Sequence, residues 1–245
     1  MTNGIVDLPQ YTWRPLPGTR PQIIPTQLIA HTAVSNASSL YGWFNSPTAK
    51  GTDAHTYIRA DGTAEQYRAA NTQANANGTA NRWWDRDNGV FRGAFSVETW
   101  DGRDPEHTPW TPQQITTLRD TALWLNRVYR IPLEICPGPY DPGIAWHSLY
   151  PGWSPGRHTC PGALRITQFH DELLPAITTA ATTQIGDITV PTNPTFGDIA
   201  NFVETCFTRA ANPDPKGRTY WTVVIAEAVN PLVPMRTMAN QLGLI

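Results

Sequence analysis

The alternation of apolar and polar positions predicts buried strands at two places in the first hundred residues. Residues 28–34, Leu-Ile-Ala-His-Thr-Ala-Val, form a short apolar run followed by Ser-Asn, which is typical of a buried strand with His31 at its end. Residues 95–100, Phe-Ser-Val-Glu-Thr-Trp, alternate in polarity and predict a second strand, which carries Glu98. Each strand therefore brings one chemically reactive side chain close to an end of the predicted sheet.

The segments around these strands have a different pattern. Residues 54–59 and 64–67 flank an Asp-Gly pair, the strongest short-range signal for a β-hairpin. Residues 69–93 mix Asn, Gly and Trp without periodicity and predict a long loop. Residues 1–22 are polar and rich in proline, and they predict an extended arm.

Helical spacing is clearest after Thr111. The sequence Thr-Pro-Gln-Gln at 111–114 combines a capping residue with proline at the first helical position, and apolar residues then recur at helical intervals to Tyr129. Residues 38–44 predict a short helix capped by Ser38 or Ser39. A further helix is expected from about Ala163 through Leu174, ending near Pro175.

The remaining chain predicts a main domain at 1–181, followed by a linker and a small helical region. Residues 182–195 are rich in Thr, Pro and Asn and predict the linker. Residues 196–245 repeat apolar side chains at helical spacing, but they are too few for a confident independent core, so their role stays open.

Composition excludes several classes of function. Only 16% of the 245 residues are charged, the formal net charge is −2, and no basic run occurs, so we expect no nucleic-acid partner. No stretch approaches eighteen apolar residues, so we expect no membrane span. The first residues lack the pattern of a signal peptide, which predicts synthesis in a cytoplasm. Three cysteines are too few for a disulfide scaffold.

The segment 146–162 carries the most distinctive chemistry. It places His147, His158 and Cys160 in a stretch too rich in Pro and Gly for helix or strand. Imidazole and thiolate are ligands that zinc prefers, and His31 is the best candidate for a third ligand. Three protein ligands leave a fourth position for water, which suits amide hydrolysis, and Glu98 is the candidate to move the proton.

Each of these residues has a simpler alternative. His31 fits a hydrogen-bonded core histidine and Glu98 a structural carboxylate, while Cys160 fits a small buried apolar residue. His158 competes with His147 for a ligand position, and Cys136 is a weaker rival of Cys160. Trp83 and Trp84, in the predicted loop, fit a substrate groove and core packing equally well.

Five segments together resemble a known family. They are Leu-Ile-Ala-His-Thr at 28–32, the hairpin sequence at 55–63, Phe-Ser-Val-Glu at 95–98, Ile-Ala-Trp-His at 144–147 and His-Thr-Cys-Pro-Gly at 158–162. In this order they resemble the type-2 N-acetylmuramoyl-L-alanine amidases, a zinc family that includes phage endolysins and peptidoglycan-recognition proteins. The resemblance covers roughly residues 22–180.

The resemblance implies a fold and a set of roles. The fold is α/β, a central mixed β-sheet flanked by helices, with a small helical region at the C-terminus. The family's ligands, two histidines and a cysteine or aspartate, correspond to His31, His147 and Cys160, and its general base corresponds to Glu98. His158 occupies the position of a family lysine thought to stabilise the oxyanion, and histidine is only partly charged at neutral pH.

The implied function is zinc-dependent hydrolysis of the bond between N-acetylmuramic acid and L-alanine in peptidoglycan, as in a phage endolysin that acts on the bacterial cell wall, with a monomer favoured. Two alternatives remain. One is a non-catalytic peptidoglycan-recognition module with the same fold. The other is a metal-free hydrolase that uses Cys160 as a nucleophile.

Overall fold

The computed structural model describes residue 8 and residues 10–49, 51–154, 156 and 158–186. The predicted helical region at 196–245, and the predicted linker from residue 187 onward, lie outside the described residues, and the division into domains stays a prediction. Among the described residues, no helix is both long enough and apolar enough to cross a membrane.

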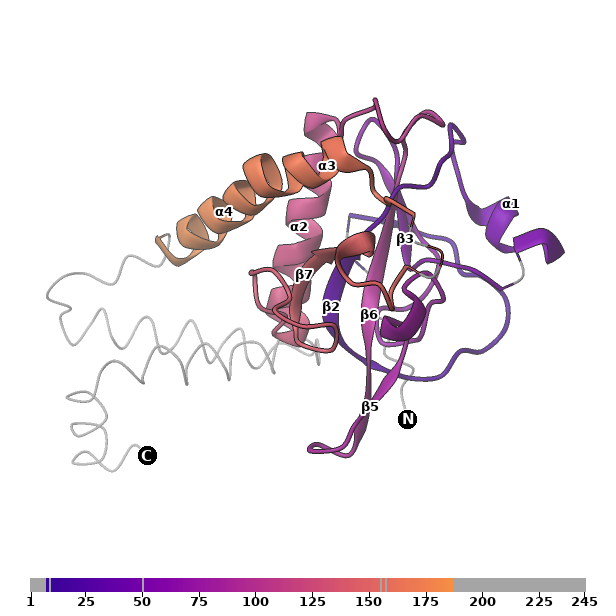
Figure 1. Ribbon diagram of the computed structural model, residues 1–245, viewed down its shortest axis with the longest axis vertical. Helices are drawn as coiled ribbons and strands as arrows, with labels where there is room; N and C mark the ends of the chain where they lie inside the picture. The colour runs from indigo at the N-terminus through magenta and orange to yellow at the C-terminus, as the bar shows by residue number, and fades with distance from the viewer. Residues whose placement is uncertain (1–7, 9, 50, 155, 157, 187–245) are drawn as a thin grey trace, which may run out of the picture. The chain divides into compact units, whose positions relative to one another are not determined.

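Within the described part of the chain, seven strands form one mixed sheet. This sheet, flanked by helices, confirms the predicted fold class (Figure 1). The strands are β1 Thr12–Trp13, β2 Ile24–Ala30, β3 Thr56–Ile58, β4 Ala64–Gln66, β5 Trp83–Asp85, β6 Val90–Thr99 and β7 Gly143–Trp146. Their order is β1-β4-β3-β6-β2-β7, and β5 pairs with β6 outside that path. The central strands β3, β6, β2 and β7 are mutually parallel, so their carboxyl ends meet at one edge of the sheet.

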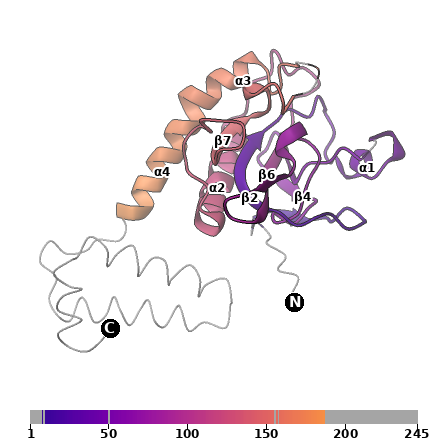
Figure 2. The ribbon, with the colours of Figure 1, turned by 60° about the horizontal axis from the view of Figure 1, so that its bottom comes forward.

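The two faces of the sheet are packed against different elements. Successive side chains of a strand point to opposite faces. Leu28 therefore joins the large core built with helix α2, Pro112–Tyr129, whereas Ile29 joins a smaller cluster around Trp153. Figure 2 shows α2 beside the sheet, with helices α3, Ala163–Gln168, and α4, Leu174–Gly186, following one another past it.

The start of α2 follows the prediction from its sequence. The Thr111 side chain accepts from the Gln114 backbone N–H, and the Gln114 side chain accepts from the Thr111 backbone N–H, which completes a capping box. Apolar side chains along the helix then fill the core, among them Leu118 and Leu125. The local signals and the tertiary packing agree on this helix.

The hairpin forms where the sequence places it, whereas the strand predicted at 28–34 lies earlier, at Ile24–Ala30, and shares only residues 28–30 with the prediction. β3 and β4 pair in antiparallel fashion, and Gly62 in the turn between them has a φ of +82°, which favours glycine. β2 ends at Ala30, so His31 directly follows the strand. The short helix α1 covers Tyr41–Phe44, but its cap is Leu40 rather than a serine, and Ser39 instead accepts from the Tyr41 backbone N–H.

The prediction of an irregular loop at 69–93 was wrong over its second half. β5 and the first residues of β6 form a second hairpin, closed by a turn in which Asp85 accepts from the Asp87 and Asn88 backbone N–H groups. Gly89, with a φ of +63°, ends this turn. The tight turn is typical of a hairpin, but the two flanking strand pieces are too short to show alternation. One-turn 3₁₀ helices complete the irregular parts, namely η1 Pro47–Ala49, η2 Gly78–Ala80 and η3 His147–Leu149.

The prediction that the last helix ends near Pro175 was also wrong. A π-helical turn, η4, at Phe169–Leu173 follows α3, and α4 then begins at Leu174 and continues to Gly186. Pro175 thus lies inside a continuous helical segment, and because proline has no N–H it leaves a carbonyl of the preceding π turn without a backbone donor. A local hydrogen-bonding shift of this kind has no signature in the sequence spacing.

His55 makes the stability of the fold depend on pH. Its ring is buried and stacked on Phe95, and its nitrogens contact the Ser96 hydroxyl and the Thr72 carbonyl. Burial lowers the pKa of His55 to about 4. Between pH ~6.5 and about 4 the unfolded chain therefore binds a proton that the folded chain does not bind, and the free energy of unfolding falls as the pH falls, by about 3 kcal/mol in total.

We expect a His55→Gln variant to lose this part of the pH dependence. Between pH ~6.5 and about 4, the fall in its free energy of unfolding should be smaller than that of the parent by about 3 kcal/mol. Urea unfolding at a series of pH values measures both. His107→Gln, at an exposed ring, is the matched control for replacing an imidazole by an amide. Equal slopes in the His55→Gln variant and the parent would contradict the assignment.

Candidate metal and active site

The register of the parallel strands places three of the predicted site residues next to one another. The last paired row of β2, β6 and β7 consists of Ala30, Val97 and Trp146. His31, Glu98 and His147 are the next residue on each strand or just beyond it, so they lie side by side at the carboxyl edge of the sheet. Alternation places all three on the face of Ile29, away from α2.

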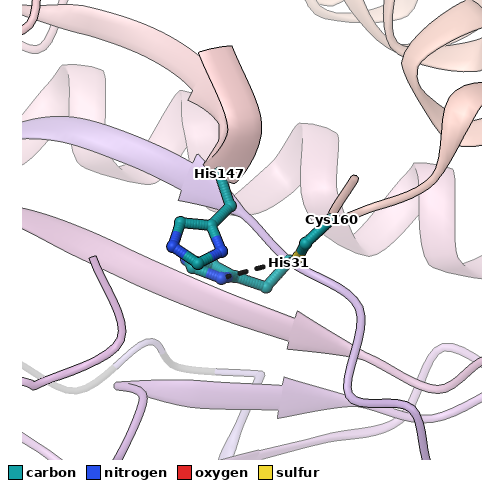
Figure 3. Close-up of side chains that lie close together, drawn as sticks. All are labelled: His31, His147 and Cys160. Atoms are coloured by element: carbon teal, nitrogen blue, oxygen red, sulfur yellow. Dashed lines mark hydrogen bonds between the residues drawn. The ribbon is translucent and has the colours of Figure 1, made fainter. Parts of the chain in front are cut away.

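Cys160 joins this row from the later loop. The candidate ligand atoms of His31, His147 and Cys160 all lie within 4.8 Å of one another. Figure 3 shows the three side chains converging from different segments of the chain, with Cys160 Sγ 3.8 Å from His31 Nδ1. Glu98 is not one of the three, but its Oε1 lies 4.0 Å from His31 Nδ1.

In both candidate histidines, the ring nitrogen Nε2 has a hydrogen-bonding partner in the protein. His31 Nε2 lies 2.7 Å from Asn77 Oδ1, and His147 Nε2 lies 2.7 Å from the Trp153 carbonyl oxygen. A donor at Nε2 leaves Nδ1 with a free lone pair, and His147 Nδ1 is buried with no partner among the described residues. Metal-binding histidines commonly have one nitrogen held in this way while the other faces the metal.

The electrostatics of the cluster favour a cation. Burial lowers the pKa of His147 to about 4 and that of His31 well below its ordinary value, so both rings are neutral near pH 7. Burial also raises the pKa of the Cys160 thiol, because a buried thiolate lacks a compensating charge. A divalent cation would supply that charge, and two neutral imidazoles with a thiolate form a donor set that zinc prefers.

Glu98 lies in an environment that suits proton transfer. Burial, reinforced by the charge of Asp101 and opposed by that of Arg165, raises the pKa of Glu98 to about 8. Its Oε2 is buried and has no hydrogen-bond partner among the described residues. A carboxylate with a free oxygen and a pKa near neutrality can both accept and return a proton.

A buried ion network behind the site was missed at the level of the sequence. Arg165 is fully buried and donates to the hydroxyls of Thr32 and Thr99 at 3.0 and 2.8 Å. Asp101 accepts from the Thr32 hydroxyl and from the Val34 backbone N–H.

This network fixes the turn that follows His31. In the same turn, the Thr32 backbone N–H contacts Cys160 Sγ at 3.3 Å. Arg165 and Asp101 are separated by 64 positions and belong to no short motif, so only the fold could reveal that both bind the Thr32 hydroxyl.

The cluster opens into a groove of about 610 Å³. Besides the cluster and Glu98, its lining includes the apolar side chains of Trp43 and Phe44 and the polar side chain of Glu106. His158 lies exposed at the mouth, with its ring centroid 4.9 Å from that of His147 and its Nδ1 3.1 Å from the Ser154 hydroxyl. The groove gives a substrate access to the cluster from solvent.

The positions of the candidate site residues in the structure distinguish them from the alternative residues that the sequence offered. His31, His147, Cys160 and Glu98 come together, and His158 lies beside them. Cys136 is buried in the smaller core cluster, outside the group of candidate ligands. Asn77 and the Trp153 carbonyl, which orient the two histidines, had no sequence signal, because each contact depends on how distant loops pack.

The fold and the site together define an α/β protein with a His-His-Cys cluster at the carboxyl edge of a mixed sheet. The sequence profile of the family described as N-acetylmuramoyl-L-alanine amidase (Amidase_2) matches residues 20–163, which is more than half of the chain. The chain therefore belongs to the N-acetylmuramoyl-L-alanine amidase family. No curated protein matches the sequence.

Several solved structures are similar to this chain. The Staphylococcus aureus hydrolase AmiA, solved in complex with its ligand, is 11% identical with a TM-score of 0.52, covering 75% of this chain and 88% of its own. The amidase LysC from Clostridium intestinale is 18% identical with a TM-score of 0.46, covering 71% of this chain and 99% of its own. The Drosophila peptidoglycan recognition protein SD is 10% identical with a TM-score of 0.47, covering 64% and 88%. At these identities the likeness is one of fold.

Proposed function

We propose that this protein is a zinc-dependent, endolysin-like amidase that hydrolyses the bond between N-acetylmuramic acid and L-alanine in peptidoglycan of the bacterial cell wall. The observation that carries the proposal is the convergence of His31, His147 and Cys160 beside Glu98, at the open end of the groove. Membership of the amidase family supports the substrate, and the donor set supports zinc.

Three side chains would hold the ion. His31 and His147 would bind through Nδ1, because their Nε2 atoms are engaged by Asn77 and Trp153, and Cys160 would bind through its thiolate. Zinc bound there lowers the pKa of water toward ~7 and polarises a carbonyl group.

The chain's own residues perform the proton transfers. Glu98 takes a proton from the attacking water and passes it to the nitrogen of the leaving amine, as the new carbon–oxygen bond forms and the carbon–nitrogen bond breaks. With the Ser154 hydroxyl donating to its Nδ1, His158 carries its proton on Nε2 and donates it in a hydrogen bond to the amide oxygen. The products are the muramoyl carboxylic acid and a peptide with a free L-alanine amine.

Elemental analysis beside a wall-lysis assay tests the proposal. We expect about one zinc per chain, because the cluster offers ligands for a single ion, and we expect lysis to stop on chelation and return with zinc but not magnesium. New N-terminal alanine, without new reducing sugar ends, would identify the bond. Zinc without hydrolysis would indicate a recognition module. Activity that survives chelation but not thiol alkylation would indicate a cysteine hydrolase.

A further inference from the structure

A second groove, of about 710 Å³, lies at the opposite edge of the same sheet. It is formed by the β5–β6 hairpin, which protrudes from the lower end of the sheet in Figure 1, together with the end of α2 and the loop before β7. Arg92, in this groove, and Glu98, at the candidate active site, are six residues apart on β6, which corresponds to about 20 Å. The second groove is therefore separate from the first.

Aromatic side chains that line the second groove are partly exposed to solvent. Trp84 is 50% exposed and Tyr140 is 51% exposed. Trp83 joins them, with its ring centroid 5.5 Å from that of Tyr140 at an interplanar angle of 52°. Of the two readings that the sequence left open for the Trp83–Trp84 pair, core packing does not apply to Trp84. Half-exposed rings with different tilts form apolar platforms that are open to a ligand.

Buried hydroxyls in the same groove lack partners. Thr26 is only 8% exposed, and its Oγ1 has no hydrogen-bond partner among the described residues. The side chain is directed here by an irregularity in β2, where Pro25 pairs with Gly93 and Gln27 with Ala94, so that Thr26 is left out of the ladder. The Tyr129 hydroxyl, which also lines the groove, is likewise buried and unpartnered. A ligand hydroxyl would supply the hydrogen-bond partner that these groups lack among the described residues.

The charged side chains restrict the kind of ligand. Asp85 and Arg92 form an ion pair at the groove, Asp87 and Asp141 add two further carboxylates and Arg130 adds one further guanidinium, so carboxylates outnumber guanidiniums by three to two. An anionic ligand would meet these carboxylates, and a purely apolar one would leave the Thr26 hydroxyl unpaired. A pyranose ring satisfies both requirements, because its C–H face stacks on an aromatic ring while its hydroxyls bond to planar carboxylate and guanidinium groups.

We propose that this groove binds a neutral oligosaccharide, namely the glycan strand of the cell wall; the choice of that glycan rests on the proposed function. The two grooves then divide the substrate between them. The carboxyl edge of the sheet cleaves the amide, and the amino edge holds a glycan strand. When the protein acts on a polymeric wall, glycan binding in the second groove raises the effective concentration of the amide bond at the candidate active site.

Titration with a peptide-free oligosaccharide tests the site directly. The probe is the β-1,4-linked tetramer of N-acetylglucosamine, added to the full-length, zinc-loaded protein and followed by calorimetry. We expect binding that weakens at least tenfold in Trp84→Ala and several-fold in Thr26→Val, which removes only the unpaired hydroxyl. Trp43→Ala is the matched control, since it removes an equally exposed tryptophan from the other groove, and it should bind the tetramer as the parent does.

Activity assays separate this proposal from the proposed function. Trp84→Ala should hydrolyse a soluble muramoyl peptide at the parental rate but release less product from insoluble walls. No binding of the tetramer, binding lost only in Trp43→Ala, or binding of a stem peptide instead of the tetramer would each overturn the glycan site, whatever the hydrolytic activity. Tetramer binding by a protein without amidase activity would support the site and refute the proposed function.

Discussion

Replacing Glu98 by Gln should lower turnover by about 10²-fold or more while leaving the zinc content unchanged. Glutamine keeps the shape of the side chain but cannot accept the proton of the attacking water. Glu98 lies 4.0 Å from His31 Nδ1 but outside the group of three candidate ligands, so metal binding does not depend on it. Steady-state kinetics on a soluble muramoyl peptide, beside elemental analysis of the same preparation, measure both quantities.

Glu106→Gln is the matched control for this variant. Glu106 is an exposed carboxylate that lines the same groove and accepts a hydrogen bond from Thr159, so it tests the loss of a negative charge near the substrate without the loss of the base. We expect near-parental turnover. If Glu98→Gln turns over normally, Glu98 is not the base; if it loses zinc, Glu98 is a ligand instead.

Replacing Cys160 by Ala should remove both zinc and activity. The thiolate is one of the three proposed protein ligands. Replacing a residue that only supports a metal ligand typically lowers metal affinity or activity by about 10–100-fold. Removing a ligand itself should therefore lower zinc affinity and activity by more than about 100-fold. Titration with a competing chelator measures the affinity. The fold should survive, because Cys160 lies at the groove and its thiol makes only weak contacts, with the Thr32 backbone N–H and with His31 Nδ1.

Two companion variants decide the role of this cysteine. Cys160→Asp restores an anionic zinc ligand but not a thiol nucleophile, so it should recover part of the zinc affinity and part of the activity. Cys136→Ala removes the other described free cysteine, which is buried away from the cluster, and should leave zinc content unchanged. Activity lost in both Cys160 variants while zinc remains bound would favour Cys160 as the nucleophile.

Local signals alone predicted part of this fold. The capping box at Thr111 and the spacing behind it define α2, and the Asp-Gly pair defines the first hairpin, because both depend on residues within a few positions of one another. Ligand chemistry likewise singled out His31, His147 and Cys160 as residue types suited to zinc. The structure brings these three together, and their role as ligands stays a prediction until metal is measured.

Other features depend on distant segments and carried no local signal. The second hairpin at β5–β6 formed within a presumed loop, and the helix passed through a π turn at Phe169–Leu173 and continued beyond Pro175 as α4. Asn77, which orients His31, and Arg165, which holds the turn after it, are 46 and 134 positions from His31.

The sequence by itself determined which side chains could carry the chemistry, because residue type and short spacing set ligand preference, capping and strand alternation. Only the tertiary structure decided that they meet. The register of three parallel strands aligned His31, Glu98 and His147 in one row, and the same strands, at their other ends, created a second groove around Thr26. Strand pairing is a long-range property, since each partner's position depends on the packing of the whole sheet rather than on its neighbours in the chain.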